Sequence, residues 1–464
     1  MDKKDWRNVS GKYYDWKVTK KPERTYIHDY SKTLTMKLFC SIPDNKGNSI
    51  VACKFDEVLE IIKKIDVFTR GIDKIIYLVG WQFQGHDDKY PSWSQVNEEL
   101  KREEDNTGLD SLKWLMNEAL SYNTTVSLHI NMTDAYKDSP LWDTYVENDL
   151  ISKEEDGSLL KIGTWNEKDA YQVCYKNEWE SGYTIKRIDN LLEMLPIRKA
   201  GTVHIDAFFA RESRGHSILL EEEQSYRRKI IRYWRDREID VTSEFIYREN
   251  GIDDLIGLVP MVWHINQTVE DYLERSATLL TGGRINRDLT DFDNRLGILF
   301  GESIHGEGLL INQKNLRIIQ PDWETKFIED FCLEVVPWYF LNRFNRLEVT
   351  GLIPNRLAYY DNDVIVKEKD KQILNGNRLI KDDTNIFVET YWKTNKEIIA
   401  YSVSGYEDKQ WKLPDSWRDV KIVNINIITG DGLVPLHNEV PVNNDSLTLT
   451  LESNQGILIE PIKF

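Results

Sequence analysis

Short apolar runs and longer amphipathic runs alternate along this chain from about residue 34 to residue 345. Lys74–Val79 is apolar over the length of a buried strand, and Phe55–Phe68 before it carries apolar residues at helical spacing. Two parallel strands need a long crossover, usually a helix, so the alternation predicts an α/β fold with a helix-covered parallel sheet. The region is long enough for a (β/α)8 TIM-type barrel with one long insertion, near residues 132–178.

The alternation of apolar and amphipathic runs predicts the following strands and helices. Six runs are expected to be strands: Thr35–Cys40, Lys74–Val79, Thr125–Ile130, Thr202–Asp206, Asp240–Phe245 and Leu258–Trp263. Helices are expected at Phe55–Phe68, Leu109–Tyr122, Thr184–Leu195 and about 218–236. The last two barrel strands are expected between residues 277 and 320. The charged run Leu219–Arg237 is interpreted as a solvated helix face.

After Arg343 the pattern changes to short alternating runs separated by turn residues. These runs are Asp363–Val366, Thr384–Glu389, Glu397–Ser402, Val420–Ile428 and Leu447–Leu451. Such spacing is typical of an antiparallel β-sandwich. We therefore expect residues 1–345 to form the barrel, with a short N-terminal extension, and residues 346–464 to form a C-terminal β-sandwich. The apolar segment Cys332–Leu341 is expected to bury its face between the two.

Composition narrows the class of partner. The 464 residues have a formal net charge of −17, which argues against nucleic acid or an anionic membrane as a partner. The 15 Trp and 22 Tyr favour carbohydrate, because indole faces stack on sugar rings. The four cysteines form no CxxC pair, so neither a zinc site nor any other cofactor is expected. With no signal-like run after Met1, a cytoplasmic location is expected, and the oligomeric state stays open.

Two acids close neighbouring expected strands. Asp206 ends Thr202–Asp206, and Glu244 lies at the end of the next strand. In a barrel these ends open onto one face, where two carboxyl groups can serve glycoside hydrolysis. The alternative is that each acid pairs structurally with a nearby arginine, for which Arg211, Arg214 and Arg248 are candidates. We favour the catalytic interpretation because both acids occur on successive strands.

The segment Gly80–Trp93 is dense in groups that bind sugars. Trp81 offers a stacking face, and His86 and Asp87 offer hydrogen bonds to vicinal hydroxyls. His86 and Asp87 suit a metal as well, but no third ligand stands at suitable spacing, and we therefore expect no metal site. A loop with its own hydrogen-bond network is the remaining interpretation.

Further candidates follow later strands. His129 and Asn131 end the third strand, and Trp263 and His264 end the sixth. Trp165 lies in the long insertion and is a candidate wall of the sugar site. For these residues, packing inside the protein is a competing interpretation of comparable weight.

Four segments together resemble the catalytic barrel of endo-α-N-acetylgalactosaminidases, glycoside hydrolase family 101. In the family's order they are Gly80–Asp87, His129–Asn131, Val203–Asp206 and Val241–Glu244. Leu333–Pro337 is similar to the closing helix before that family's β-domain. The sequence departs from the family at Gln84, where Glu is common, and at Phe208–Phe209, which replace Gly-Asn.

The resemblance implies roles for the matching residues. Asp206 would be the nucleophile and Glu244 the general acid/base, while His86 and Asp87, with His129 and Asn131, would hold the terminal sugar. The implied function is a retaining glycoside hydrolase that cleaves an α-linked galacto-configured sugar, N-acetylgalactosamine or galactose, from an oligosaccharide or glycoside. A retaining mechanism needs carboxyl groups about 5–5.5 Å apart. The alternative is a non-catalytic carbohydrate-binding protein on the same barrel. A lyase or isomerase would need a metal cluster or a lysine base, and the sequence pattern displays neither.

Overall fold

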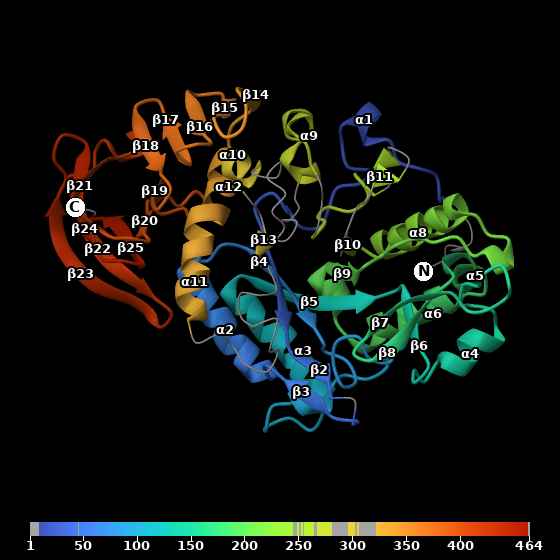
Figure 1. Cartoon of the computed structure of the whole chain (residues 1–464). Helices are drawn as coiled ribbons and strands as arrows, with labels where there is room; N and C mark the ends of the chain where they lie inside the picture. The colour runs from blue at the N-terminus through green and yellow to red at the C-terminus, as the bar shows by residue number, and fades with distance from the viewer. Residues whose placement is uncertain are drawn as a thin grey trace.

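The core of the protein is a six-stranded parallel sheet in the order β10-β9-β5-β4-β1-β13 (Figure 1). The computed structural model describes residues 9–44, 46–244, 248–249, 252–253, 255–263, 267–280, 296–301, 304–305 and 322–462. The strands are β1 (Leu34–Phe39), β4 (Lys74–Val79), β5 (Thr124–Asn131), β9 (Thr202–Asp206), β10 (Asp240–Ser243) and β13 (Ile304–His305). All neighbouring pairs are parallel, as the alternation predicted.

Helices cover the sheet because its strands are apolar on both faces. All six residues of β4 are buried, for example, which requires layers on both sides. The main covering helices are α2 (Phe55–Phe68), α3 (Gly108–Glu118), α6 (Tyr183–Met194) and α8 (Leu220–Arg235). In α2, Val58, Ile62 and Ile65 are fully buried, and Asp56 and Glu57 in the first turn complement the helix dipole. These four helices were expected from the sequence.

The edge of the sheet beyond β10 is occupied by the segment expected to be the sixth strand. Leu258–Trp263 forms no ladder, but Val262 makes a single parallel bridge with Ser243. The Trp263 amide donates to the Ser243 carbonyl at 2.8 Å, which holds the segment beside β10. At the other edge β13 pairs with β1, within the range expected for the last strands. The rest of that range, apart from residues 277–280 and 296–301, lies outside the described residues, and the described strands form an open sheet without barrel closure.

The long insertion folds into a small layer of its own. It contains a three-stranded antiparallel sheet in the order β6-β8-β7, and two short helices precede and follow the β7–β8 hairpin. The elements are β6 (Asp134–Tyr136), α4 (Trp142–Glu147), β7 (Lys161–Trp165), β8 (Lys168–Gln172) and α5 (Tyr175–Glu180). The hairpin tip reaches the loop after β4, because Asn166 Nδ2 donates to the His86 carbonyl at 3.0 Å.

The prediction that Leu219–Arg237 presents a solvated face is wrong. Within α8 the side chains of Glu223, Arg227, Arg228 and Arg232 are buried. The N-terminal segment lies over this helix: Arg232 Nε donates to Glu23 Oε1 at 2.8 Å, and further bonds from Arg228 and Arg232 reach backbone carbonyls at residues 10–12. Charge alone did not reveal which segment would satisfy these guanidinium groups.

A continuous helical segment joins the two halves of the chain. It runs through α11 (Trp323–Asp330), the π-helical turn η8 (Phe331–Val335) and α12 (Val336–Leu341). Pro337 lacks the N–H that would bond the carbonyl four residues earlier, and a π turn precedes it. Residues of α12 are buried throughout, so this apolar segment packs in the interior as expected.

The C-terminal part is antiparallel, with two very unequal layers. A ten-stranded sheet has the order β14-β15-β16-β17-β18-β19-β20-β25-β22-β23, and a two-stranded sheet pairs β21 with β24. The apolar cluster around Phe387, Trp411 and Leu449 fills the space between them. The strands are β14 (Arg346–Thr350), β15 (Leu357–Tyr360), β16 (Val364–Lys367), β17 (Gln372–Asn375), β18 (Arg378–Lys381), β19 (Asn385–Glu389), β20 (Ile398–Ser402), β21 (Tyr406–Lys412), β22 (Ile422–Thr429), β23 (Gly432–Pro441), β24 (Ser446–Leu451) and β25 (Gln455–Pro461).

The remaining elements are short. They are α1 (Trp16–Thr19), β2 (Ser41–Pro43), β3 (Ser49–Val51), α7 (Ile197–Ala200), β11 (Arg248–Glu249), β12 (Ile252–Asp253), α9 (Val269–Glu274) and α10 (Leu296–Phe300). Among the described residues, no helix combines the length and apolar character needed to cross a bilayer.

Candidate active site

The carboxyl ends of four adjacent strands bring the candidate polar residues to one edge of the sheet. In the β5–β9 pairing, His129 lies opposite His204 and Asn131 lies opposite Asp206. Ser243 lies opposite Ile205 in the next pair, so Glu244 follows β10 at the level of Asp206. Parallel register therefore places residues distant in sequence on the same level, as the sequence analysis expected.

The loop after β4 is fixed against β2 by two glycines. A side chain at Gly80 would place its Cβ 2.0 Å from the Ser41 carbonyl oxygen, and one at Gly85 would come within 2.6 Å of the Ile42 Cα. The His86 amide donates to the same Ser41 carbonyl at 2.9 Å. The spacing of the two glycines thus holds His86 at the mouth of the sheet.

Asp206 is mostly buried and surrounded by donors and cations. Its Oδ2 lies 3.4 Å from His129 Nε2 and accepts from Asn131 Nδ2 at 3.3 Å. Burial alone would raise the pKa of Asp206, but the positive influence of His129, His86 and Lys37 outweighs it and holds this pKa well below its usual value. Asp206 is therefore ionised at neutral pH.

Glu244 is paired with a lysine from β1. The ammonium of Lys37, whose side chain has no exposed surface, contacts Glu244 Oε1. Lys37 also lies over the ring of Trp263, with Nζ 4.6 Å from the ring centroid. The side chain of Glu244 is 10% exposed, so the ion pair lies at the bottom of the site.

His129 lies between the two acids. Each carboxyl group has an oxygen within 4.8 Å of a ring nitrogen of His129. Burial lowers the pKa of His129 to about 4, against the opposing influence of Asp206, so the imidazole is neutral at pH 7. Asp206, His129 and Glu244 thus form one buried ionisable cluster.

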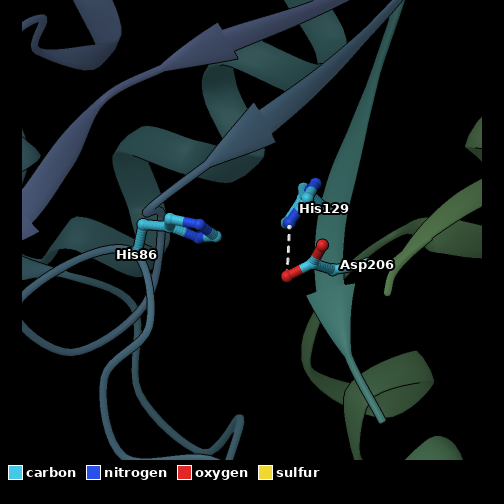
Figure 2. Close-up of side chains that lie close together, drawn as sticks. All are labelled: His86, His129 and Asp206. Carbon is cyan, nitrogen blue, oxygen red and sulfur yellow. Dashed lines mark ion pairs between the residues drawn. The ribbon is translucent and has the colours of Figure 1, made fainter. Parts of the chain in front are cut away.

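His86 faces the pair of His129 and Asp206 across the site (Figure 2). Its ring extends toward His129, with the two ring centroids 5.2 Å apart. His86 Nε2 lies 3.3 Å from Asp87 Oδ2, and Asp87 has a left-handed backbone with φ of 55°. A non-glycine residue in this region is held there by its surroundings, so the loop presents His86 and Asp87 in one set orientation.

One protein family matches the segment that contains most of these residues. Residues 32–249 match the sequence model of the family described as endo-alpha-N-acetylgalactosaminidase, glycoside hydrolase family 101. This segment is therefore similar to that family over a little less than half of the chain. The match includes Asp206, Glu244, His86 and His129, but it ends before Trp263 and His264.

Solved structures with a similar fold include alpha-N-acetylgalactosaminidase NagBb from Bifidobacterium bifidum. Its GalNAc complex has a TM-score of 0.53 and 12% identity over 75% of this chain and 58% of that chain. Its ligand-free form has a TM-score of 0.52 and 12% identity over 74% and 58%. The chain therefore spans 58% of the length of these structures, and the likeness shows the fold alone.

The candidate tryptophans occupy different environments. Trp81 is fully buried, and its indole donates to the His129 carbonyl at 2.9 Å, so it holds the end of β5 and has no face open to a sugar. Trp165, at the end of β7, is 47% exposed. Trp263 is buried beside Lys37 and His204, where it forms the bottom of the site. His264 lies outside the described residues.

Asn131 joins the site to the insertion. Its Oδ1 accepts from the amides of Thr133 and Asp134, at 2.7 and 2.8 Å, and its Nδ2 faces Asp206. Within the described residues, neither Arg211 nor Arg214 is a partner of Asp206. Arg211 bonds Gln172, Arg214 pairs with Glu212, and the side chain of Arg248 lies outside the described part.

Three residues of the site escaped the sequence analysis. They are Lys37, His204 and Asp134. His204 is fully buried, bonds Thr242 Oγ1 through Nδ1 at 2.8 Å, and places Nε2 3.9 Å from Glu244 Oε1. Burial, with the charges of Asp87 and Asp206, raises the pKa of Asp134 well above its usual value. The sequence did contain one signal for such residues, namely an ionisable side chain inside or shortly after an apolar strand.

Proposed function

We propose that this protein is a retaining glycoside hydrolase that acts on an α-linked galacto-configured sugar, N-acetylgalactosamine or galactose. The observation that carries the proposal is the position of Asp206 and Glu244. They lie at the ends of adjacent parallel strands, both beside His129, inside the segment that matches family 101. For the fold we infer a (β/α)8 barrel, of which the described parallel sheet is a part.

Asp206 is the proposed nucleophile. A carboxylate that attacks an anomeric carbon must be ionised, and the low pKa of Asp206 supports that state across the working range. Asn131 and His129 hold the same oxygen, Oδ2, so the other oxygen is oriented for attack. The new bond joins this oxygen to the sugar, and the glycosidic oxygen leaves.

Glu244 is the proposed acid/base. It gives a proton to the leaving oxygen in the first step and removes one from water in the second. The ammonium of Lys37 favours the carboxylate, which is the form used in the second step. For the first step, the bound glycoside must weaken this ion pair and exclude water, so that the proton resides on Glu244.

His86, Asp87 and Asn131 are the proposed groups for the terminal sugar. A sugar hydroxyl that donates to the Asp87 carboxylate, next to one that bonds the His86 ring, discriminates strongly between hydroxyl configurations. Their fixed loop supports recognition of one configuration, because misplaced hydroxyls would leave buried polar groups without partners. Trp165 is a candidate wall of the leaving-group side.

A non-catalytic carbohydrate-binding protein is the alternative. It would use the same loop and the same aromatic residues, but it would not need Asp206 and Glu244 together. A binding protein should retain glycan affinity and show no turnover of any activated glycoside.

Hydrolysis of aryl α-glycosides tests the proposal. We expect the wild-type chain to release p-nitrophenol from the α-N-acetylgalactosaminide or the α-galactoside, and Asp206→Asn to release none. Proton NMR of the first product should show the α-anomer, as retention requires. Absence of turnover on the α- and β-glycosides of the common hexoses, with retained glycan binding, would favour the binding protein.

A further inference from the structure

His86, His129 and Asp206 reach one point from three separate parts of the sheet edge (Figure 2). The sequence offered His86 and Asp87 as metal ligands and lacked a third. The fold supplies partners that lie 43 and 120 residues after His86 in the chain. Sequence spacing could not indicate this grouping, because each residue ends or follows a different strand.

We propose that these three side chains form a binding site for a divalent transition-metal ion of the zinc type. Two imidazoles and one carboxylate are ligands that Zn²⁺ and Co²⁺ take readily. A tetrahedral ion with bonds of about 2.0–2.1 Å holds its ligand atoms about 3.3–3.4 Å apart. His129 Nε2 and Asp206 Oδ2 are already 3.4 Å apart.

His86 completes the set with a small movement. One potential ligand atom from each of the three residues lies within 4.8 Å of the others. The ring of His86 must therefore approach by at most about 1.4 Å to reach tetrahedral spacing. Its side chain is 19% exposed and projects from a loop, so rotation about its own bonds can supply this shift.

Asp87 is the outer partner in this arrangement and takes no direct bond to the ion. It lies 3.3 Å from His86 Nε2, and the buried Nδ1 of His86 makes no hydrogen bond within the described part of the chain. A carboxylate on the distal nitrogen of a ligating imidazole orients the ring and strengthens the ligand. This contact leaves Nδ1, which has no hydrogen-bond partner among the described residues, available to the ion.

A second group, His129 with His204 and Glu244, is equally compact but less suited to an ion. The ammonium of Lys37 already contacts Glu244 Oε1 and occupies the place of a cation. His204 has no exposed surface, whereas Asp206 and His86 retain 14% and 19%. An ion that enters from solvent meets the first group and can keep a water molecule there.

The ion site overlaps the proposed sugar site. Zn²⁺ bound to Oδ2 of Asp206 would neutralise the carboxylate whose other oxygen attacks the sugar and would withdraw His86 from sugar binding, so ion and glycoside exclude each other. This competition rests on the proposed function, but binding of the ion itself does not. Zinc would then inhibit the enzyme by competition with its substrate.

Titration of the untagged full chain with Co²⁺ tests the site directly. Tetrahedral Co²⁺ with nitrogen and oxygen ligands has visible absorption bands that report its ligand set. We expect one bound equivalent, displaced by Zn²⁺. His86→Ala and Asp206→Asn should weaken binding by about 100-fold or more, and Asp87→Asn by about 10-fold. Glu244→Gln, and His437→Ala at an exposed histidine of the C-terminal sheet, should leave the affinity unchanged.

The outcomes separate cleanly. Absence of stoichiometric bands in the wild type, or bands that persist in both His86→Ala and Asp206→Asn, would overturn the site. So would loss of binding in Glu244→Gln with retention in His86→Ala, which would move the ion to the second group. Competitive inhibition by Zn²⁺ then links the ion to the enzyme. A wild-type chain that binds Co²⁺ but turns over no glycoside would refute the proposed function and leave the ion site standing.

Discussion

The ammonium of Lys37 contacts the carboxylate of Glu244, although the two residues are 207 positions apart and both are buried. Removing the positive charge removes an interaction that favours the ionised acid. In Lys37→Met we expect kcat/KM for α-glycosides to fall by about tenfold or more, because the buried carboxyl of Glu244 loses a charged partner. Lys37→Arg keeps the charge and should lose less. A wild-type kcat/KM in Lys37→Met would separate Lys37 from the acid/base.

Asp206→Ala should abolish turnover, because no covalent glycosyl-enzyme can form. Added azide or formate should enter the space of the missing carboxyl and partly restore the rate, with inverted product. The glycosyl azide anomer identified by NMR is the measurement. Asp189→Ala, on α6 and paired with Arg237, is the matched control and should retain wild-type turnover. Equal activity of Asp206→Ala and wild type would exclude the assignment.

Glu244→Ala should discriminate between leaving groups. Dinitrophenyl glycosides need no proton to depart, so their first step should proceed nearly normally. Alkyl and sugar leaving groups should lose about 10²–10⁴-fold in rate, the usual contribution of general acid catalysis. A uniform loss over all leaving groups would assign Glu244 to binding or folding.

The low pKa of His129 predicts how stability depends on pH. The folded imidazole titrates at about 4, whereas the unfolded one titrates near 6.5. Below pH 6.5 the unfolded chain therefore binds more protons, and the free energy of unfolding falls as the pH drops from about 6.5 to 4. Urea unfolding at several pH values should reveal a shallower fall in His129→Gln. The same slope in variant and wild type would contradict a buried neutral imidazole.

Trp392 should link the two halves of the chain. Its indole donates to the Thr69 carbonyl at 3.0 Å, and its ring lies near Phe331 and Tyr339. Trp392→Ala should cost about 2–4 kcal/mol of unfolding free energy, since it removes a large side chain and leaves a cavity. A single cooperative thermal transition should remain, at lower Tm. Two separate transitions in the wild type, or a stable active fragment of residues 1–345, would contradict one packed unit.

The regular part of the fold could be predicted because its signals are local. Lys74–Val79 and Phe55–Phe68 have the apolar pattern of the structures they form, and the expected bounds are those found. Strand-end acids were predictable for the same reason, since Asp206 directly follows an apolar run. The match to family 101 confirms the resemblance that these segments indicated.

The partners of the site residues could not be predicted, because they depend on packing across strands. Lys37 lies in an apolar strand, where the sequence does not reveal its partner. The fold brings β1 near the end of β10, and there the ammonium of Lys37 contacts Glu244. Trp81 was expected to offer a sugar face, yet the tight turn at Gly80 directs its indole to the His129 carbonyl. The charged surface of α8 was misjudged because its covering segment lies about 200 residues earlier in the chain.

The contact between the N-terminal segment and α8 has a consequence for synthesis of the chain. Residues 10–23 are synthesised before Arg232, which binds Glu23 and the carbonyls of Ser10 and Lys12 and is made about 210–220 residues later. At about 5–20 residues per second this delay lasts roughly 10–45 s. During that time the early segment has no docking surface and is open to chaperones and proteases. A chaperone that holds nascent chains should therefore raise the yield of folded protein. A bulky fusion close to residue 10 should lower that yield.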